Sequence, residues 1–132
     1  MSHSTQEFSG RVAVLNDLDV LAFVSAFTQL PTESALHTQL STVWRAALEV
    51  AGPGTIDLKL GNIIRSKDDA DALMKFLRST RELASQAGPI LPSSWSKELV
   101  TGSGLVLSDS YPSNLLFDAI SELESLIAQP DD

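Results

Sequence analysis

The chain has 132 residues, with nine Lys and Arg against seventeen Asp and Glu, and it contains no cysteine. Its formal net charge of −8 at pH 7 disfavours nucleic-acid binding, because a phosphate backbone repels an acidic protein. The missing cysteines exclude disulfides, zinc–thiolate sites and cysteine nucleophiles, and they favour a reducing compartment. Because 43% of the residues are hydrophobic, a chain of this length can bury one core.

No targeting or membrane-spanning segment is apparent in the sequence. The N-terminal residues MSHSTQEFSG lack the basic and apolar regions of a signal peptide. The most apolar stretch, residues 12–30, is interrupted by Asn16, Asp17 and Asp19, and acids at such a position are costly in lipid. We therefore expect a soluble, cytoplasmic protein that does not associate with a membrane.

The first third of the chain predicts a disordered tail followed by a central helix. Residues 1–9 are expected to be disordered, as are residues 130–132, on either side of one globular domain over 10–129. The RVAVL stretch after the first tail predicts a short strand or the approach to a helix. That helix should begin at Asn16 or Asp17, either of which can cap it, and end at Pro31. It is apolar on all sides, which is typical of a central helix.

A second helix and a strand are predicted next. Thr32 is a suitable N-cap, and the apolar stripe that follows includes Trp44, which we expect in the core. Gly52 is placed just beyond the C-cap, where the helix should end. Residues 55–60 (TIDLKL) alternate apolar and polar side chains, which is the pattern of a half-buried strand.

The second half of the chain predicts two further helices. Ser66, with Asp69 three residues later, resembles a capping box and should begin a helix that runs to about Ser85. Opposite charges three and four residues apart predict ion pairs along its outer face. The remaining expected elements are a helical turn at 95–100, a flexible break at 101–104, a strand at 105–107 and a final helix capped by Ser113 or Asn114. The predicted fold is mainly α, with four principal helices and two or three short β-strands in a single compact α+β domain.

The sequence predicts no catalytic residue, metal site or cofactor. His37 lies at the edge of the second helix's apolar stripe, where it could act as a general base or pack its ring against the core. Packing is favoured, because no nucleophile or orienting acid has a recognisable spacing and no Gly-x-Ser-x-Gly motif is present. Asp68, Asp69 and Asp71 fall at the start of a helix, where the dipole and nearby lysines account for them without a metal ion.

The charge is unevenly distributed along the chain. Residues 1–97 contain all nine basic and ten acidic residues and sum to −1, whereas residues 98–132 contain seven acidic residues and no basic one and sum to −7. We therefore expect an acidic C-terminal face that binds a partner. Trp95 and Tyr111, each in a loop, are candidate aromatic anchors, although packing on the protein's own core is the alternative for both. The candidate partner-binding residues are Trp95, Glu98, Asp109, Tyr111, Asp118, Glu122 and Glu124.

These observations favour a non-enzymatic domain that binds a basic protein partner through its acidic C-terminal face. An immunity or antitoxin-type inhibitor of a basic toxin is an example, since complementary charge accelerates association and excludes wrong partners. The alternative is a homo-oligomeric scaffold or chaperone-like protein, such as a homodimer that packs through the apolar face of the last helix. A third hypothesis is a small hydrolase that uses His37 with a carboxylate.

Overall fold

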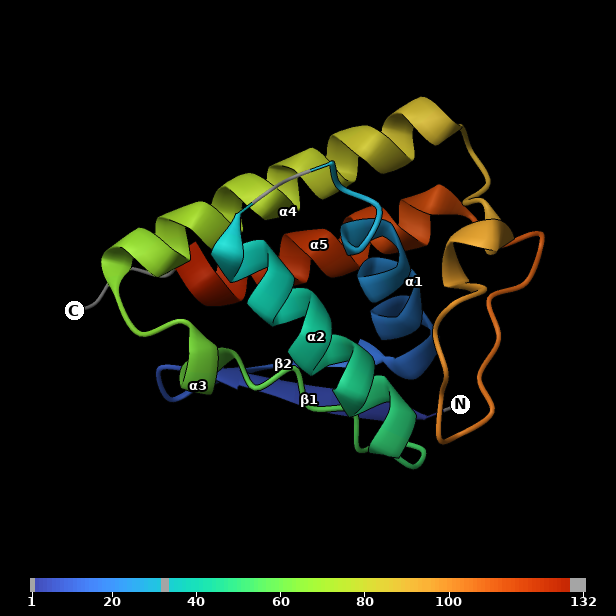
Figure 1. Cartoon of the computed structure of the whole chain (residues 1–132). Coiled ribbons are helices and arrows are strands. Elements are labelled where there is room, and N and C mark those ends of the chain that lie inside the picture. The colour runs from blue at the N-terminus through green and yellow to red at the C-terminus, as the bar shows by residue number, and fades with distance from the viewer. Residues whose placement is uncertain (1, 32–33, 129–132) are drawn as a thin grey trace.

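The computed structural model describes residues 2–31 and 34–128, which form one α+β domain (Figure 1). The predicted fold class is confirmed. A β-hairpin lies at the bottom of the view in Figure 1, α4 and α5 lie at the top, and α1 and α2 stand between them. The elements in chain order are β1 (His3–Phe8), β2 (Arg11–Asn16), α1 (Asp17–Phe27), α2 (Ala35–Val50), α3 (Leu60–Ile63), α4 (Lys67–Ala87), the 3₁₀ turn η1 (Ser93–Ser96) and α5 (Ser113–Ala128).

The hairpin is the main departure from the expected fold. Strands β1 and β2 are antiparallel, and Ser9 and Gly10 connect them with positive φ angles of 52° and 76°. Two successive left-handed residues match the twist of a hairpin. The prediction of a disordered tail is therefore wrong for residues 3–8. That tail was expected because the segment is polar, but its inward-facing residues, Ser4 and Gln6, are themselves polar and fully buried. The predicted tail at 130–132 lies outside the described residues.

Helix α1 is the centre of the domain, as its all-round apolar sequence predicts. Asn16 is its N-cap, and the side chain of Asn16 accepts a hydrogen bond from the Leu18 backbone N–H at 2.9 Å. All residues from 20 to 27 are buried, and α1 packs against α2, α4, α5 and η1. The helix ends at Phe27, with Thr28 as its C-cap, rather than continuing to Pro31.

Helix α2 packs its aromatic residues on α1. The helix begins at Ala35 with Ser34 as its N-cap, while the expected cap Thr32 lies outside the described residues. Trp44 is fully buried, as predicted, and its ring centroid lies 4.6 Å from that of Phe27. Its indole N–H donates to the Leu58 carbonyl oxygen at 2.8 Å, so the one polar atom of this core side chain is satisfied.

Helices α4 and α5 pack against each other across the top of the domain (Figure 1). Ser66 caps α4, as predicted, by accepting a hydrogen bond from the Asp69 N–H at 3.1 Å. The apolar face of α5, on which the alternative of a homodimer rested, is largely buried within the chain, although Leu115 is 40% exposed. The buried apolar residues of α5 are Leu116, Ala119, Ile120, Leu123, Leu126 and Ile127. No helix in the described part of the chain has the length and apolar character needed to cross a membrane.

The segment at 55–59 alternates as predicted but is not a strand. Ile56 and Leu58 are buried, whereas Asp57 and Lys59 are exposed. Its backbone bonds to a side chain: the Leu58 N–H donates to Gln6 Oε1 at 2.9 Å, and Gln6 Nε2 donates to the Ile56 carbonyl at 2.8 Å. Because Gln6 projects from the inner face of β1, the segment crosses that face instead of extending the sheet. The prediction of a strand at 105–107 is likewise wrong, because these residues form no strand.

Candidate functional site

A cleft of about 580 Å³ is lined by residues of η1 and by residues 105–109 of the following loop. Such a volume is within the range of ligand and side-chain pockets. Apolar and polar residues line it in equal number. The apolar lining residues are Leu21, Leu99, Leu105, Val106 and Leu107, and the polar ones are Ser93, Ser96, Lys97, Ser108 and Asp109.

The loop that forms this cleft is attached to the end of α2. The Gly102 N–H donates to the Leu48 carbonyl oxygen at 2.9 Å, which satisfies one of the terminal carbonyls of that helix. The Thr101 hydroxyl donates to the Leu105 carbonyl at 2.8 Å. The segment at 101–104, which was expected to be a flexible break, is thus hydrogen-bonded both to itself and to α2.

Two of the candidate partner-binding residues lie beside the cleft. Asp109 is exposed and accepts a hydrogen bond from the Ser93 hydroxyl, which joins the 105–109 segment to η1. Trp95 is partly buried and packs against the hydrophobic core. The packing alternative for Trp95 is thus confirmed, so its ring is only in part available to a partner.

Tyr111 is a core residue and not a partner contact. Only 2% of its surface is exposed, and its hydroxyl donates to Asp19 Oδ1 at 2.6 Å. Burial, together with the bond to Asp19, raises the pKa of the Tyr111 phenol above its usual value of 10. The assignment of Tyr111 to the partner surface is corrected, because its turn folds the ring onto α1.

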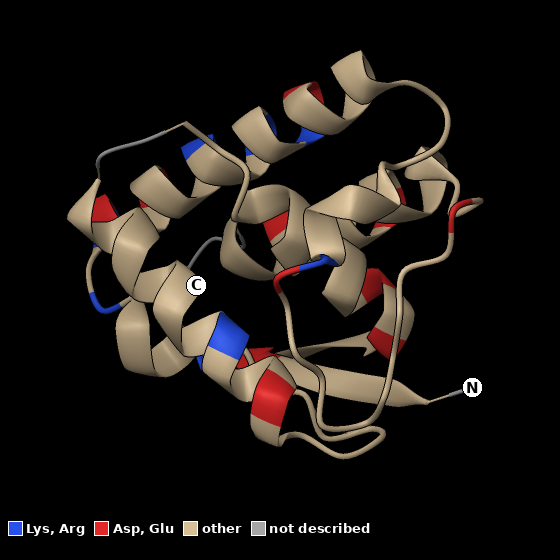
Figure 2. Ribbon diagram, turned by 45° about the vertical axis from the view of Figure 1, so that its right-hand side comes forward, with Lys and Arg blue, Asp and Glu red and all other residues tan. Residues whose placement is uncertain are grey.

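An acidic surface extends from the start of α1 to α5. Burial raises the pKa of Asp19 above its usual value of 3.8, the Tyr111 hydroxyl bond lowers it, and the negative charge of Asp118 raises it further. Asp118 is exposed on α5, one turn before the exposed Glu122. In Figure 2 the ribbon where α1 begins, at the right of the view, carries red segments and no blue one. His3 is the basic group that acts on Asp19, and its charge lowers the pKa of the carboxyl by less than Asp118 raises it.

Replacing Asp19 by Asn should change the pH dependence of stability. Because the folded-state pKa is raised, the protonated carboxyl contributes stability that is present below pH 3.8 and lost as the pH rises through the folded-state pKa. Asp19→Asn removes this loss and keeps an oxygen that accepts the Tyr111 hydroxyl. We expect the variant to gain stability relative to wild type as the pH rises above 3.8, measured by urea unfolding at a series of pH values. Glu82→Gln, an exposed change on α4, is the control, and an equal pH trend in both variants would contradict the assignment.

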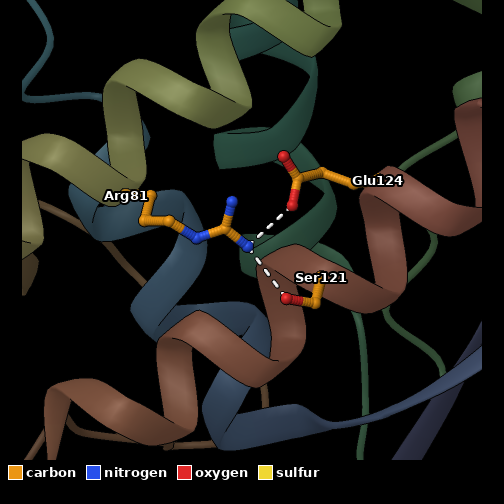
Figure 3. A network of polar contacts seen from close by, with 3 residues as sticks. All are labelled: Arg81, Ser121 and Glu124. Carbon is orange, nitrogen blue, oxygen red and sulfur yellow. Dashed lines mark hydrogen bonds and ion pairs between the residues drawn. The ribbon is translucent and has the colours of Figure 1, made fainter.

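Glu124 is neutralised within the fold. Its carboxylate lies 2.6 Å from Arg81 Nη2, and the same nitrogen donates to the Ser121 hydroxyl at 2.8 Å (Figure 3). A partner would therefore have to displace Arg81 from Glu124. The pair joins α4 to α5, whereas the ion pairs predicted along α4 itself do not form: among the described residues no other pair lies within 4.0 Å.

His37 packs as the sequence analysis favoured. It is 6% exposed, its Nε2–H donates to the Phe27 carbonyl oxygen at 2.8 Å, and its ring stacks on that of Phe27 at a centroid distance of 4.3 Å. Within residues 2–31 and 34–128, no three His, Asp or Glu side chains are grouped so as to hold a metal ion.

The sequence analysis missed a polar network under the hairpin. Asp17, at the start of α1, is 2% exposed and accepts hydrogen bonds from the Ser4 hydroxyl and, at 2.8 Å, from the Gly54 N–H. The Ser4 oxygen in turn accepts a bond from the Ile56 N–H at 3.0 Å. No apolar–polar alternation in HSTQEF signals this network, because the residues on both faces of the strand are mostly polar.

Comparisons with known protein families, with curated proteins and with solved structures find no match for this chain.

Proposed function

We propose that this protein is a non-enzymatic binding domain for a basic protein partner. The acidic binding surface that we propose would consist of Glu98 and Asp109, in the loop between η1 and α5, and of Asp118 and Glu122, on α5. The observation that carries the proposal is that all four are exposed and that none lies within 4.0 Å of a Lys or Arg nitrogen in the described residues. Glu124, which pairs with Arg81, and Tyr111, which is buried, are not part of this surface.

The neighbouring cleft supports the proposal with a second kind of contact. Val106, which lines the cleft, and Val100, in the same loop, are 76% and 63% exposed. Protein interfaces combine an apolar centre with a polar or charged rim, and a few residues in such a centre supply most of the affinity. A partner segment with Lys or Arg beside an apolar side chain would fit this arrangement. Its apolar group would enter the cleft while its cations approach Asp109.

The charge of the surface suggests how association would proceed. Opposite charges accelerate encounter by long-range attraction, and this attraction weakens as salt screens it. We favour a cytoplasmic inhibitor that binds and neutralises a basic toxin, as immunity proteins and antitoxins do, because its association would be accelerated in this way. Binding of such a partner requires no catalytic group on this chain.

Neutralising the acidic binding surface should abolish binding to a basic partner. We would immobilise the wild type, the variant Glu98→Gln/Asp109→Asn/Asp118→Asn/Glu122→Gln and the control Glu7→Gln/Glu49→Gln/Glu82→Gln, and capture proteins from the native host. The proposal expects a basic protein that the wild type and the control retain and the first variant loses. Its association rate should fall at least about tenfold between 50 and 500 mM salt. If every captured protein binds the neutral variant equally well, or associates at a rate independent of salt, the proposal fails.

A further inference from the structure

A second cleft, of about 660 Å³, lies on another part of the molecule. It is formed by the hairpin turn, the segment that leads into α4, the first turns of α4 and the end of α5. Arg11, Arg65 and Lys67 line it, together with one acidic residue, Asp71. One third of the nine basic residues of this acidic chain are thus gathered at one site. Phe8 and Ile64 contribute apolar wall.

The two arginines are held in place without being neutralised. Arg11 Nη2 donates to the Leu126 carbonyl oxygen at 3.3 Å, and Arg65 Nε donates to the Asn62 carbonyl at 2.9 Å. Arg11 Nε is buried and has no hydrogen-bond partner. None of the three cations lies within 4.0 Å of a carboxylate of the described residues. A guanidinium has five N–H donors, so each arginine keeps several that a ligand could use.

The nearby acidic residues offset part of this charge, because Asp68 and Asp69 stand in the first turn of α4 and Asp71 follows them. Asp71 is exposed and lines the cleft. Asp69 accepts a bond from the Arg65 backbone N–H at 3.2 Å and so is used in capping α4, while Asp68 is exposed and does not line the cleft. The lining itself carries three positive charges against one negative charge, while Asp68 and Asp69 complement the helix dipole at the start of α4.

We propose that this basic cleft binds a small molecule that carries carboxylate or phosphate groups. Arg11 and Arg65 would bind its oxygens through paired N–H groups, the arrangement that makes arginine effective for both anions, and Lys67 would add a third positive charge. The apolar wall would contact the body of the ligand. The volume is that of a small-molecule site.

The same chemistry is available from the chain itself. Asp131 and Asp132 follow Ala128, a residue that lines the cleft, by three and four positions in the sequence. A peptide spans at most about 3.6 Å per residue, so the Cα atoms of these two residues are within about 14 Å of the Ala128 Cα. Their carboxylates can compete with a free anion, and the test must separate the two sources.

Calorimetric titration with citrate and with inorganic phosphate at low salt tests the proposal. The wild type should bind citrate at one saturable site, and Arg65→Gln/Lys67→Gln should weaken that binding about tenfold or more. Arg45→Gln/Arg78→Gln, which removes two exposed cations outside the cleft, should leave it unchanged. Amide chemical shifts on titration should move at Arg11, Arg65 and Lys67.

The tail variant Asp131→Asn/Asp132→Asn identifies the competitor. If this variant binds citrate more tightly than the wild type, or binds it when the wild type does not, the result supports the basic cleft as an anion site. It also identifies the chain's own carboxylates as an occupant of that site. Equal binding by both supports the cleft with a free anion alone. The proposal is overturned if neither protein binds citrate or phosphate saturably, or if binding is insensitive to the loss of Arg65 and Lys67.

Discussion

Gln6→Ala should destabilise the protein by about 3–5 kcal/mol. Gln6 is fully buried, and its amide closes two hydrogen bonds with the backbone of residues 56–58. Truncation leaves the Leu58 N–H and the Ile56 carbonyl without partners in the core and opens a cavity beside them. Chemical denaturation followed by circular dichroism measures the change in the free energy of unfolding.

A second substitution separates the hydrogen bonds from the cavity. Gln6→Leu nearly preserves the volume but cannot bond to either backbone group, so it should still cost about 2–4 kcal/mol. Glu7→Ala, at the neighbouring exposed position of β1, is the matched control and should change stability by less than about 0.5 kcal/mol. A Gln6→Leu variant as stable as the wild type would show that the side chain is a space filler and that the bonds to 56–58 add nothing.

Gln6 also explains why the sequence predicted some elements and missed others. Helices α2, α4 and α5 follow from apolar periodicity and α1 from its all-round apolar sequence, and both patterns reflect burial directly. The same logic placed Ile56 and Leu58 inward, and both are buried. The hairpin escaped this logic because Ser4 and Gln6 on its inner face are polar, so its burial is achieved through hydrogen bonds and not through apolar side chains.

In the candidate sites, too, features that depend on the local sequence could be predicted, whereas features that depend on tertiary contacts could not. The excess of acid after residue 97 is visible in the sequence, and four of its carboxylates are exposed without ion pairs in the described structure. Two other assignments depended on contacts across long sequence separations. Tyr111 bonds to Asp19 and Glu124 pairs with Arg81, and no local pattern reports either partner. The basic cleft was missed for the same reason, because it brings Arg11 together with Arg65 and Lys67 from a distant part of the sequence.

Gly102→Ala should destabilise the protein by about 2–3 kcal/mol and loosen the loop at 98–107. A Cβ at this position would lie 2.5 Å from the Glu49 carbonyl oxygen and 2.9 Å from that of Ala51. Both contacts are with backbone at the end of α2, so neither can be relieved by a side-chain rotation. The loop must move away from α2, and the bond from the Gly102 N–H to the Leu48 carbonyl must lengthen or break.

Amide hydrogen exchange provides the local measurement. Gly104→Ala is the matched control, because Gly104 has a φ of 78° but open space around the new Cβ, so it introduces backbone strain of about 1 kcal/mol without a clash. Amide 102 should lose protection when Gly102 is replaced and keep it when Gly104 is replaced.

Because the same loop presents Glu98 and the wall of the cleft beside Asp109, Gly102→Ala should also weaken binding of a basic partner while every acidic side chain remains. Unchanged protection and stability in Gly102→Ala would mean that the close approach of the loop to α2 does not hold this surface in place.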